Sequence, residues 1–175
     1  MIAALFRVHN VHARELTAPA DRAGALLDRI GRPGDPLWPA PAWPSMVLEG
    51  PLAAGVRGRH GPIRYHVSRY RPGREIEFNF ADGVGVRGTH TLTVEPAGRD
   101  RCVLRHVVAG QLYGPMRAVW PLGMRWMHDA CVEDLLDRAE IALGTGPARP
   151  ARWSPWVRFL QRYAGSSNHD VGVTR

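Results

Sequence analysis

The feature that most constrains the fold is a long helical pattern across residues 115–143. Its apolar residues recur at steps of three to five and predict one buried stripe: Val119, Gly123, Met127, Ala130, Leu135, Ala139 and Ala142. The charged residues between them predict a solvated face: Asp129, Glu133, Asp134, Asp137, Arg138 and Glu140. Pro121 clashes with the carbonyl four residues back, so we expect a kink or a short lead-in helix before Leu122. A helix with one long apolar side needs a broad surface to pack on.

The residues before this helix predict that surface, an antiparallel sheet. Five two-residue turn signals punctuate the chain: Gly50-Pro51, Gly61-Pro62, Pro72-Gly73, Asp82-Gly83 and Ala97-Gly98. Strands are expected over residues 54–60, 63–71, 75–80, 86–95 and 101–112. Closely spaced strands with tight turns indicate an antiparallel meander. The predicted class is therefore α+β, with a sheet curled around the C-terminal helix.

The first 44 residues predict a strand, a helix and an irregular link. Over residues 6–16 the side chains expected to face inward are Phe6, Val8, Val11 and Ala13, with a bulge near Asn10. A helix opens at residues 17–19 and ends at Gly31, and its expected buried stripe is Ala23, Leu26, Leu27 and Ile30. The proline-rich link over residues 32–44 carries Trp38 and Trp43. They either fasten the link to the core, the interpretation we favour, or form a rim over a pocket.

The composition indicates one domain with an ordinary core. The 175 residues contain no apolar run long enough to span a membrane and no signal-peptide pattern, so we expect a cytoplasmic protein. The net charge is +7 and every basic side chain other than histidine is arginine, but the arginines are scattered, which argues against a nucleic-acid partner. Cys102 and Cys131 are far apart and without metal-ligand spacing, so two free thiols are expected over a disulfide.

Four phrases carry a resemblance to a known superfamily: GPIRYHVSRYRPGREIEFNF, RGTHTLTVEP, CVLRHVVAGQLYGPMR and WPLGMRWMHDACVEDLLDRAE. Together with the order of elements, they resemble the START-like or SRPBCC superfamily, and within it the polyketide cyclase/dehydrase and lipid-transport group. The likeness covers roughly residues 3–144, so we expect a ligand-binding domain over residues 1–146 and a separate tail over 147–175. The resemblance implies a helix-grip fold of about seven strands, with a cavity for hydrophobic ligands between sheet and helix.

Histidines are the residues most able to carry chemistry in such a cavity. His90 and His106 each share strand parity with apolar neighbours and are expected to point inward. If the turn near residues 97–100 pairs Leu92 with Leu104, the two histidines are cross-strand neighbours, whereas a register shifted by one residue separates them. We therefore name His90 and His106 as candidate acid–base residues, against the alternative that each is a hydrogen-bonded structural residue. His66 is harder to place, and His128, which follows Met127 on the long helix, is expected at the edge of the apolar stripe.

The remaining cavity residues follow from strand parity and the helix stripe. The side chains expected to contact a ligand are Trp38, Trp43, Tyr65, Phe78, Phe80, Leu92, Leu104, Val108, Met127 and Cys131. No nucleophile motif is present, and no metal site or cofactor is predicted. The glycine-rich GVGVRG stretch enters a strand and not a helix, so it does not predict a dinucleotide loop.

Three functions follow from these patterns. The leading prediction is binding of a hydrophobic small molecule, lipid- or polyketide-like, in the cavity. The alternative is an aromatase/cyclase-type enzyme in which cavity histidines move protons. The third is a membrane- or partner-binding module that uses the tail. Oligomeric state is not predicted.

The tail combines aromatic and basic residues at helical spacing. Its aromatic and aliphatic side chains predict one face of a short helix, flanked by arginines: Trp153, Trp156, Phe159, Leu160 and Tyr163, with Arg152, Arg158 and Arg162. Such a helix can lie in an anionic membrane interface or dock on the domain. We expect docking, with Pro155 in the first turn and a disordered end from Gly165.

Overall fold

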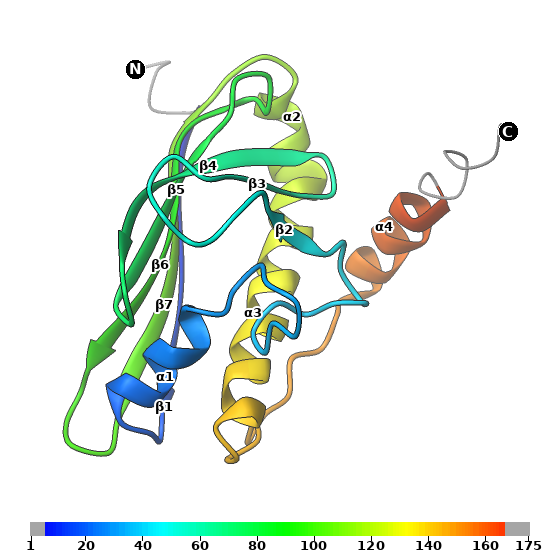
Figure 1. Cartoon of the computed structure of the whole chain (residues 1–175). Coiled ribbons are helices and arrows are strands. Elements are labelled where there is room, and N and C mark those ends of the chain that lie inside the picture. Colours follow the sequence, from blue (N-terminus) through cyan, green and yellow to red (C-terminus); the bar gives the residue numbers. More distant parts are fainter. Residues whose placement is uncertain (1–5, 167–175) are drawn as a thin grey trace, which may run out of the picture.

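A seven-stranded antiparallel sheet curves around one long helix in the computed structural model, which describes residues 6–166 (Figure 1). The strands lie in the order β1-β7-β6-β5-β4-β3-β2. Their bounds are β1 Arg7–Leu16, β2 Met46–Leu48, β3 Arg57–His60, β4 Ile63–Arg71, β5 Glu75–Phe80, β6 Val86–Pro96 and β7 Cys102–Leu112. The predicted α+β class, with a curved sheet of about seven strands, is confirmed.

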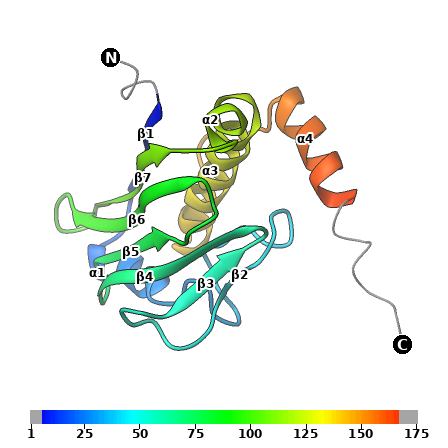
Figure 2. The same cartoon turned by 90° about the horizontal axis from the view of Figure 1, so that it is seen from above.

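The C-terminal helix is built from three consecutive pieces. They are α2 Met116–Val119, the π-helical stretch η2 Trp120–Met124 and α3 Arg125–Ala142. Pro121 lies in η2, where the wider turn replaces a regular α-helical one. Seen from above, the strands curve around α3, and the last helix, α4 Pro155–Ser166, lies beside α2 and α3 (Figure 2). No helix in the described part of the chain is long and apolar enough to cross a bilayer.

The core lies between the concave face of the sheet and α3. Buried side chains of the helix pack against buried side chains of the strands: Val132, Leu135, Leu136, Ala139 and Leu143 against Ile76, Phe78, Leu92, Val94 and Leu104. The helix α1 Ala20–Leu27 closes one end with Ala23 and Leu27. Leu135 and Ala139 of the predicted stripe are buried, but Val119 and Ala142 are exposed. The stripe follows steps of three and four from Val132 to Leu143, which places Ala142 off the contact face.

Strand β1 differs from its prediction. It pairs continuously with β7, without a bulge, and Val11 and Ala13 are exposed. The inward positions are taken by Asn10, His12 and Arg14, because each finds a carboxylate on α3. The prediction that Val11 and Ala13 face inward is therefore wrong, because polar side chains are stable in inward positions where they have a hydrogen-bonding partner.

The predicted solvated face of α3 is wrong for the same reason. The Arg14 guanidinium donates hydrogen bonds to Glu133 at 2.9 Å, to Asp137 at 3.0 Å and to Glu140. Asp137 is buried, and its other oxygen accepts a hydrogen bond from the Ala151 N–H at 2.6 Å. These carboxylates bind β1 and the tail to the helix.

The link and the tail are joined at one carboxylate of α3. Trp43 Nε1 and Trp153 Nε1 both donate to Asp134 Oδ2, at 2.7 and 2.8 Å. Their rings meet edge to face at 5.2 Å. The tail then enters α4 at Pro155, and Val157 is buried. The end expected to be disordered lies outside the described residues, apart from Gly165 and Ser166, which finish α4.

Candidate functional site

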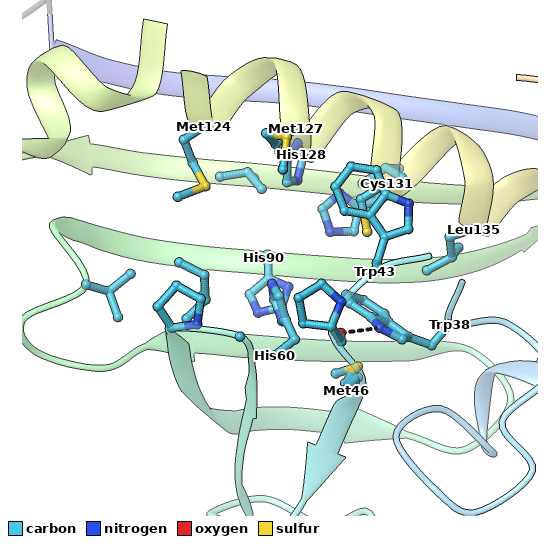
Figure 3. Close-up of a pocket in the computed structure, with 18 of the residues that line it drawn as sticks. Trp38, Trp43, Met46, His60, His90, Met124, Met127, His128, Cys131 and Leu135 are labelled. Atoms are coloured by element: carbon cyan, nitrogen blue, oxygen red, sulfur yellow. Dashed lines mark hydrogen bonds between the residues drawn. The ribbon is translucent and has the colours of Figure 1, made fainter. Parts of the chain in front are cut away.

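A cavity of about 550 Å³ lies between the sheet and α3. Most of its lining is apolar and comes from β5, β6 and β7 on one side and from η2 and α3 on the other. In Figure 3, Met124, Met127 and Cys131 lie along the helix, across from His60 and His90. The cavity volume falls within the range of small-molecule sites.

The residues that the sequence places at a cavity mostly line this one. Those at its surface are Trp38, Trp43, Phe78, Phe80, His90, Leu92, His106, Val108, Met127 and Cys131. Tyr65 and Leu104 do not line it and are buried behind it. Tyr65 packs edge-on against Phe78 at 5.0 Å and hydrogen-bonds His60 at 3.2 Å, so it supports the wall. Leu104 belongs to the main core.

The proline-rich link forms one rim of the cavity. Trp38 and Trp43 line it, and both indoles are held by hydrogen bonds, Trp38 Nε1 to the Pro44 carbonyl at 2.9 Å and Trp43 Nε1 to Asp134. The two interpretations of these tryptophans are therefore compatible, because each residue both fastens the link and borders the cavity. Leu160 and Gln161 of α4 complete the lining.

Four histidines form a row along the cavity: His60, His90, His106 and His128. Successive ring centroids are separated by 6.4 Å, 5.9 Å and 5.1 Å in that order. They come from β3, β6, β7 and α3, so the row crosses from the sheet to the helix. His66 does not line the cavity.

The register that brings His90 and His106 together is not the expected one. Leu92 pairs with His106 and His90 with Val108, which is a shift of two residues from a pairing of Leu92 with Leu104. Because the shift is even, both side chains remain on the concave face. The condition for direct pairing is therefore not met, and the two rings are diagonal neighbours.

Burial keeps these imidazoles uncharged at neutral pH. Desolvation, with a smaller contribution from His128, lowers the pKa of His60 to about 4. Burial also lowers the pKa of His90, His106 and His128, since a charged ring is disfavoured in an apolar surrounding. Each can therefore accept a proton or a hydrogen bond at one ring nitrogen.

Three of the four rings carry a buried nitrogen without a hydrogen-bond partner in the described part of the chain. These atoms are His90 Nε2, His106 Nδ1 and His128 Nε2. An unpaired buried polar atom costs about 1–3 kcal/mol. The cavity wall therefore carries unmet hydrogen-bonding capacity at three points.

His128 is oriented by a carboxylate network outside the cavity. Asp129 Oδ1 accepts a hydrogen bond from Asn10 Nδ2 at 2.8 Å and lies 3.1 Å from His12 Nε2 and 3.4 Å from His128 Nδ1. Burial opposes ionisation of Asp129, but hydrogen bonds from His12, His128 and Asn10 outweigh it and hold the pKa well below its usual range. With Nδ1–H directed at this carboxylate, Nε2 of His128 is the basic nitrogen.

His12, His128 and Asp129 are also spaced as metal ligands, with one ligand atom of each within 4.8 Å of the others. The hydrogen bonds account for the spacing, because His12 uses its second nitrogen on Glu133 at 2.7 Å. The hydrogen bond with Asp129, opposed by burial and helped by Glu133, raises the pKa of His12. A protonated His12 between two carboxylates satisfies all three groups.

Sequence reasoning missed His60 and His12. His60 ends the short strand β3, whose sequence RGRH has no apolar residue to mark an inward face. His12 lies between Val11 and Ala13, which were expected to face inward. In both cases the informative signal is a partner on another element: Tyr65 and His90 for His60, and Glu133 for His12.

No family model and no curated protein matches the sequence. Solved structures match across most of the chain. CalU16 from Micromonospora echinospora has a TM-score of 0.56 and 16% identity, over 91% of this chain and 84% of that one. Truncated norcoclaurine synthase from Thalictrum flavum has a TM-score of 0.59 and 17% identity, over 79% of this chain and 94% of that one. EF2215 from Enterococcus faecalis, a conserved protein of unknown function, has a TM-score of 0.57 and 12% identity, over 95% of this chain and 88% of that one. These likenesses confirm the predicted helix-grip fold, a curved antiparallel sheet around a long C-terminal helix.

Proposed function

We propose that the protein binds a hydrophobic small molecule, lipid- or polyketide-like and bearing at least one polar group, in the cavity between sheet and helix. The observation that carries this proposal is the combination of a cavity of about 550 Å³ with three unpartnered imidazole nitrogens in its wall. Each ring borders the cavity. His128 is held at Asp129, but a half turn of the His90 or His106 ring about its Cβ–Cγ bond exchanges ring nitrogens and carbons. A hydroxyl or carbonyl of the ligand can therefore satisfy a nitrogen that the protein leaves unpaired.

The lining favours a flat or flexible apolar body. Trp38 and Trp43 offer aromatic surface at the rim, and Met124 and Met127 adapt to irregular shapes along the helix. Norcoclaurine synthase, which shares the fold, has been solved in complex with dopamine and hydroxybenzaldehyde. That complex supports small aromatic compounds as the first ligands to test.

Titration with anthraquinone and a monohydroxylated anthraquinone tests the proposal. We expect micromolar binding of the hydroxylated compound, measured by quenching of tryptophan fluorescence, and about tenfold weaker binding of the parent because one hydrogen bond to a buried group is absent. Cys131→Trp fills the cavity and should abolish binding. Ala142→Trp, on an exposed position of the same helix, is the matched control and should bind normally. Equal binding by the wild type and Cys131→Trp would contradict the proposal.

A second candidate is a cyclase-type enzyme, and the observation that favours it is the Asp129–His128 arrangement at the cavity wall. A neutral His128 could remove a proton from a methylene between two carbonyls of a bound poly-β-ketone chain. The carbanion would attack a second carbonyl of the same chain, a carbon–carbon bond would form, and the alkoxide would regain the proton from the imidazolium. Cavity walls that fold the chain would supply proximity.

Turnover of a tetraketide thioester tests the second candidate, because it is the shortest poly-β-ketone chain in which a methylene between two carbonyls can close a six-membered ring onto another carbonyl. His128→Gln should lower the rate of cyclisation about 100-fold or more while hydroxyanthraquinone binding changes only a few-fold. His106→Ala tests the neighbouring ring in the same assay, and His66→Gln, away from the cavity, is the control. Cyclised product at the buffer rate with the wild type would remove this candidate and leave ligand binding standing.

A further inference from the structure

Large exposed apolar side chains gather at one place on the molecule. Six of them lie on α2, η2, α3 and α4, each between 43% and 68% exposed: Val119, Leu122, Trp126, Trp156, Phe159 and Tyr163. We call this set the aromatic face. In the rest of the described chain the large exposed hydrophobics are Val11 on β1, Val47 on β2 and Ile141 at the C-terminal end of α3, far along the helix from Trp126. Clustering of this kind marks a surface that binds something.

Direct contacts join the two halves of the aromatic face. Trp156 Nε1 donates a hydrogen bond to the Leu122 carbonyl at 3.0 Å, which ties α4 to η2. Trp156 stacks on Phe159 at 5.3 Å, and Phe159 contacts Tyr163 at 4.7 Å. The face is therefore one ordered surface and not a set of isolated side chains.

The charge around the aromatic face is mostly positive. Residues 115–128 and 145–163 contain six arginines and no aspartate or glutamate: Arg117, Arg125, Arg149, Arg152, Arg158 and Arg162. All six are exposed. Asp129 pairs with Arg125 at 3.6 Å and lines a small surface pocket with Glu133 and Trp126, so the local excess of positive charge comes from the other five arginines. Such a surface attracts an anionic partner.

The opposite side of α4 contacts the domain. Val157 is buried, and Leu160 and Gln161 line the cavity. Docking on the domain and contact with a membrane therefore use different faces of the same helix, so the two outcomes weighed from the sequence are compatible. Figure 2 shows α4 beside α2 and α3, where both halves of the face lie.

We propose that the aromatic face docks on the surface of an anionic lipid bilayer. Tryptophan, phenylalanine and leucine side chains enter the interfacial region, while the arginines meet lipid phosphates. One short helix has little apolar area, but Leu122 and Trp126 add a second contact region beside α4. Two copies of this face would bring together surfaces of equal charge, which favours an anionic bilayer over a second copy of the chain.

This proposal goes beyond ligand binding in the cavity and does not depend on it. It places the helix that covers part of the cavity against the membrane, so a hydrophobic ligand could pass between bilayer and cavity without crossing bulk water. The chemistry of the partner is an anionic phospholipid head group above an acyl layer.

Flotation of the full-length protein with vesicles tests the proposal. With vesicles of phosphatidylcholine containing about 30 mol% phosphatidylglycerol, we expect cofloating protein and a blue shift of tryptophan emission, and weak binding with phosphatidylcholine alone. Leu122→Ser/Phe159→Ser should lower the partition coefficient at least tenfold. Arg152→Gln/Arg158→Gln should lower it about 25-fold, since each arginine near the surface contributes about fivefold.

Matched variants distinguish docking through the aromatic face from the effect of losing apolar area or positive charge elsewhere on the surface. Val47→Ser/Ile141→Ser removes exposed apolar side chains elsewhere, and Arg22→Gln/Arg59→Gln removes exposed charges elsewhere; both should bind within twofold of the wild type. An unchanged unfolding midpoint and an unchanged far-ultraviolet circular dichroism spectrum show that a variant is folded. The proposal is overturned if the wild type does not float with anionic vesicles, or if all variants float equally. It is also overturned if Leu122→Ser/Phe159→Ser abolishes self-association of the protein without affecting flotation.

Discussion

Replacement of His90 by phenylalanine is expected to raise the free energy of unfolding of the ligand-free protein by about 1–3 kcal/mol. The His90 ring stacks on Phe78 at 4.7 Å and on Phe80 at 5.0 Å, and its Nε2 has no hydrogen-bond partner in the described chain. A phenyl ring preserves both stacking contacts and buries no polar atom. The substitution should therefore remove a cost that the wild type carries in the absence of ligand.

The same substitution should weaken the function that we propose. His90→Phe is expected to bind the hydroxylated anthraquinone about tenfold less tightly while affinity for the parent compound is maintained, so the preference between the two disappears. A gain in stability coupled to a loss of selectivity is typical of a residue retained for binding.

Urea unfolding and fluorescence titration measure the two effects. His90→Gln is the control, because it keeps a polar group but loses the stacked ring, and it should be less stable than the wild type. If His90→Phe is destabilised by more than about 1 kcal/mol, His90 is a satisfied structural residue, and its nitrogen is not available to a ligand.

Patterns that are local in sequence predicted most of the fold. The alternation of Ile76, Phe78 and Phe80, and the turn signals around it, are properties of a few adjacent residues. The spacing of Leu135 and Ala139 on the long helix is equally local. These features depend on the period of a strand or helix, and the structure has them where the sequence predicts them.

Features that depend on distant partners were predicted poorly. The inward orientation of His12 and Arg14 is stabilised by carboxylates more than 115 residues away, which strand alternation cannot reveal. The register between β6 and β7 depends on the length of the turn after Pro96, and a shift of two residues leaves the parity unchanged. Strand parity therefore predicted that His90 and His106 lie on the same face of the sheet, but it did not predict which residues pair with them.

Acidification is expected to destabilise the protein between pH 7 and pH 5 through the cavity histidines. Desolvation lowers the pKa of His60 to about 4, whereas the unfolded chain takes up this proton near pH 6.5. The unfolded state therefore binds more protons as the pH falls from 6.5 toward 4. The contribution of His60 to stability is present above pH 6.5 and is lost through that window.

The expected loss from His60 alone is about 2 kcal/mol between pH 7 and pH 5. His90 and His106 act in the same direction, because burial lowers their pKa values below that of the unfolded chain. The pKa of His12 is raised, so its contribution is fully present below pH 6.5 and is lost as the pH rises. The lowered pKa of Asp129 matters only below about pH 4, outside this window.

Urea unfolding at pH 7, 6 and 5 measures how the free energy of unfolding changes with pH. The variant His60→Gln shows how much of this change comes from His60. In His60→Gln the loss between pH 7 and pH 5 should be about 2 kcal/mol smaller than in the wild type, because the group that takes up the proton is gone. His66→Gln, which removes a histidine that does not line the cavity, should leave the slope unchanged. Equal slopes in the wild type and His60→Gln would mean that His60 is hydrated in solution and that water reaches this end of the cavity.

A bound hydroxyanthraquinone should protect against acid, because it binds the folded protein with neutral rings and so shifts the equilibrium away from the protonated unfolded chain.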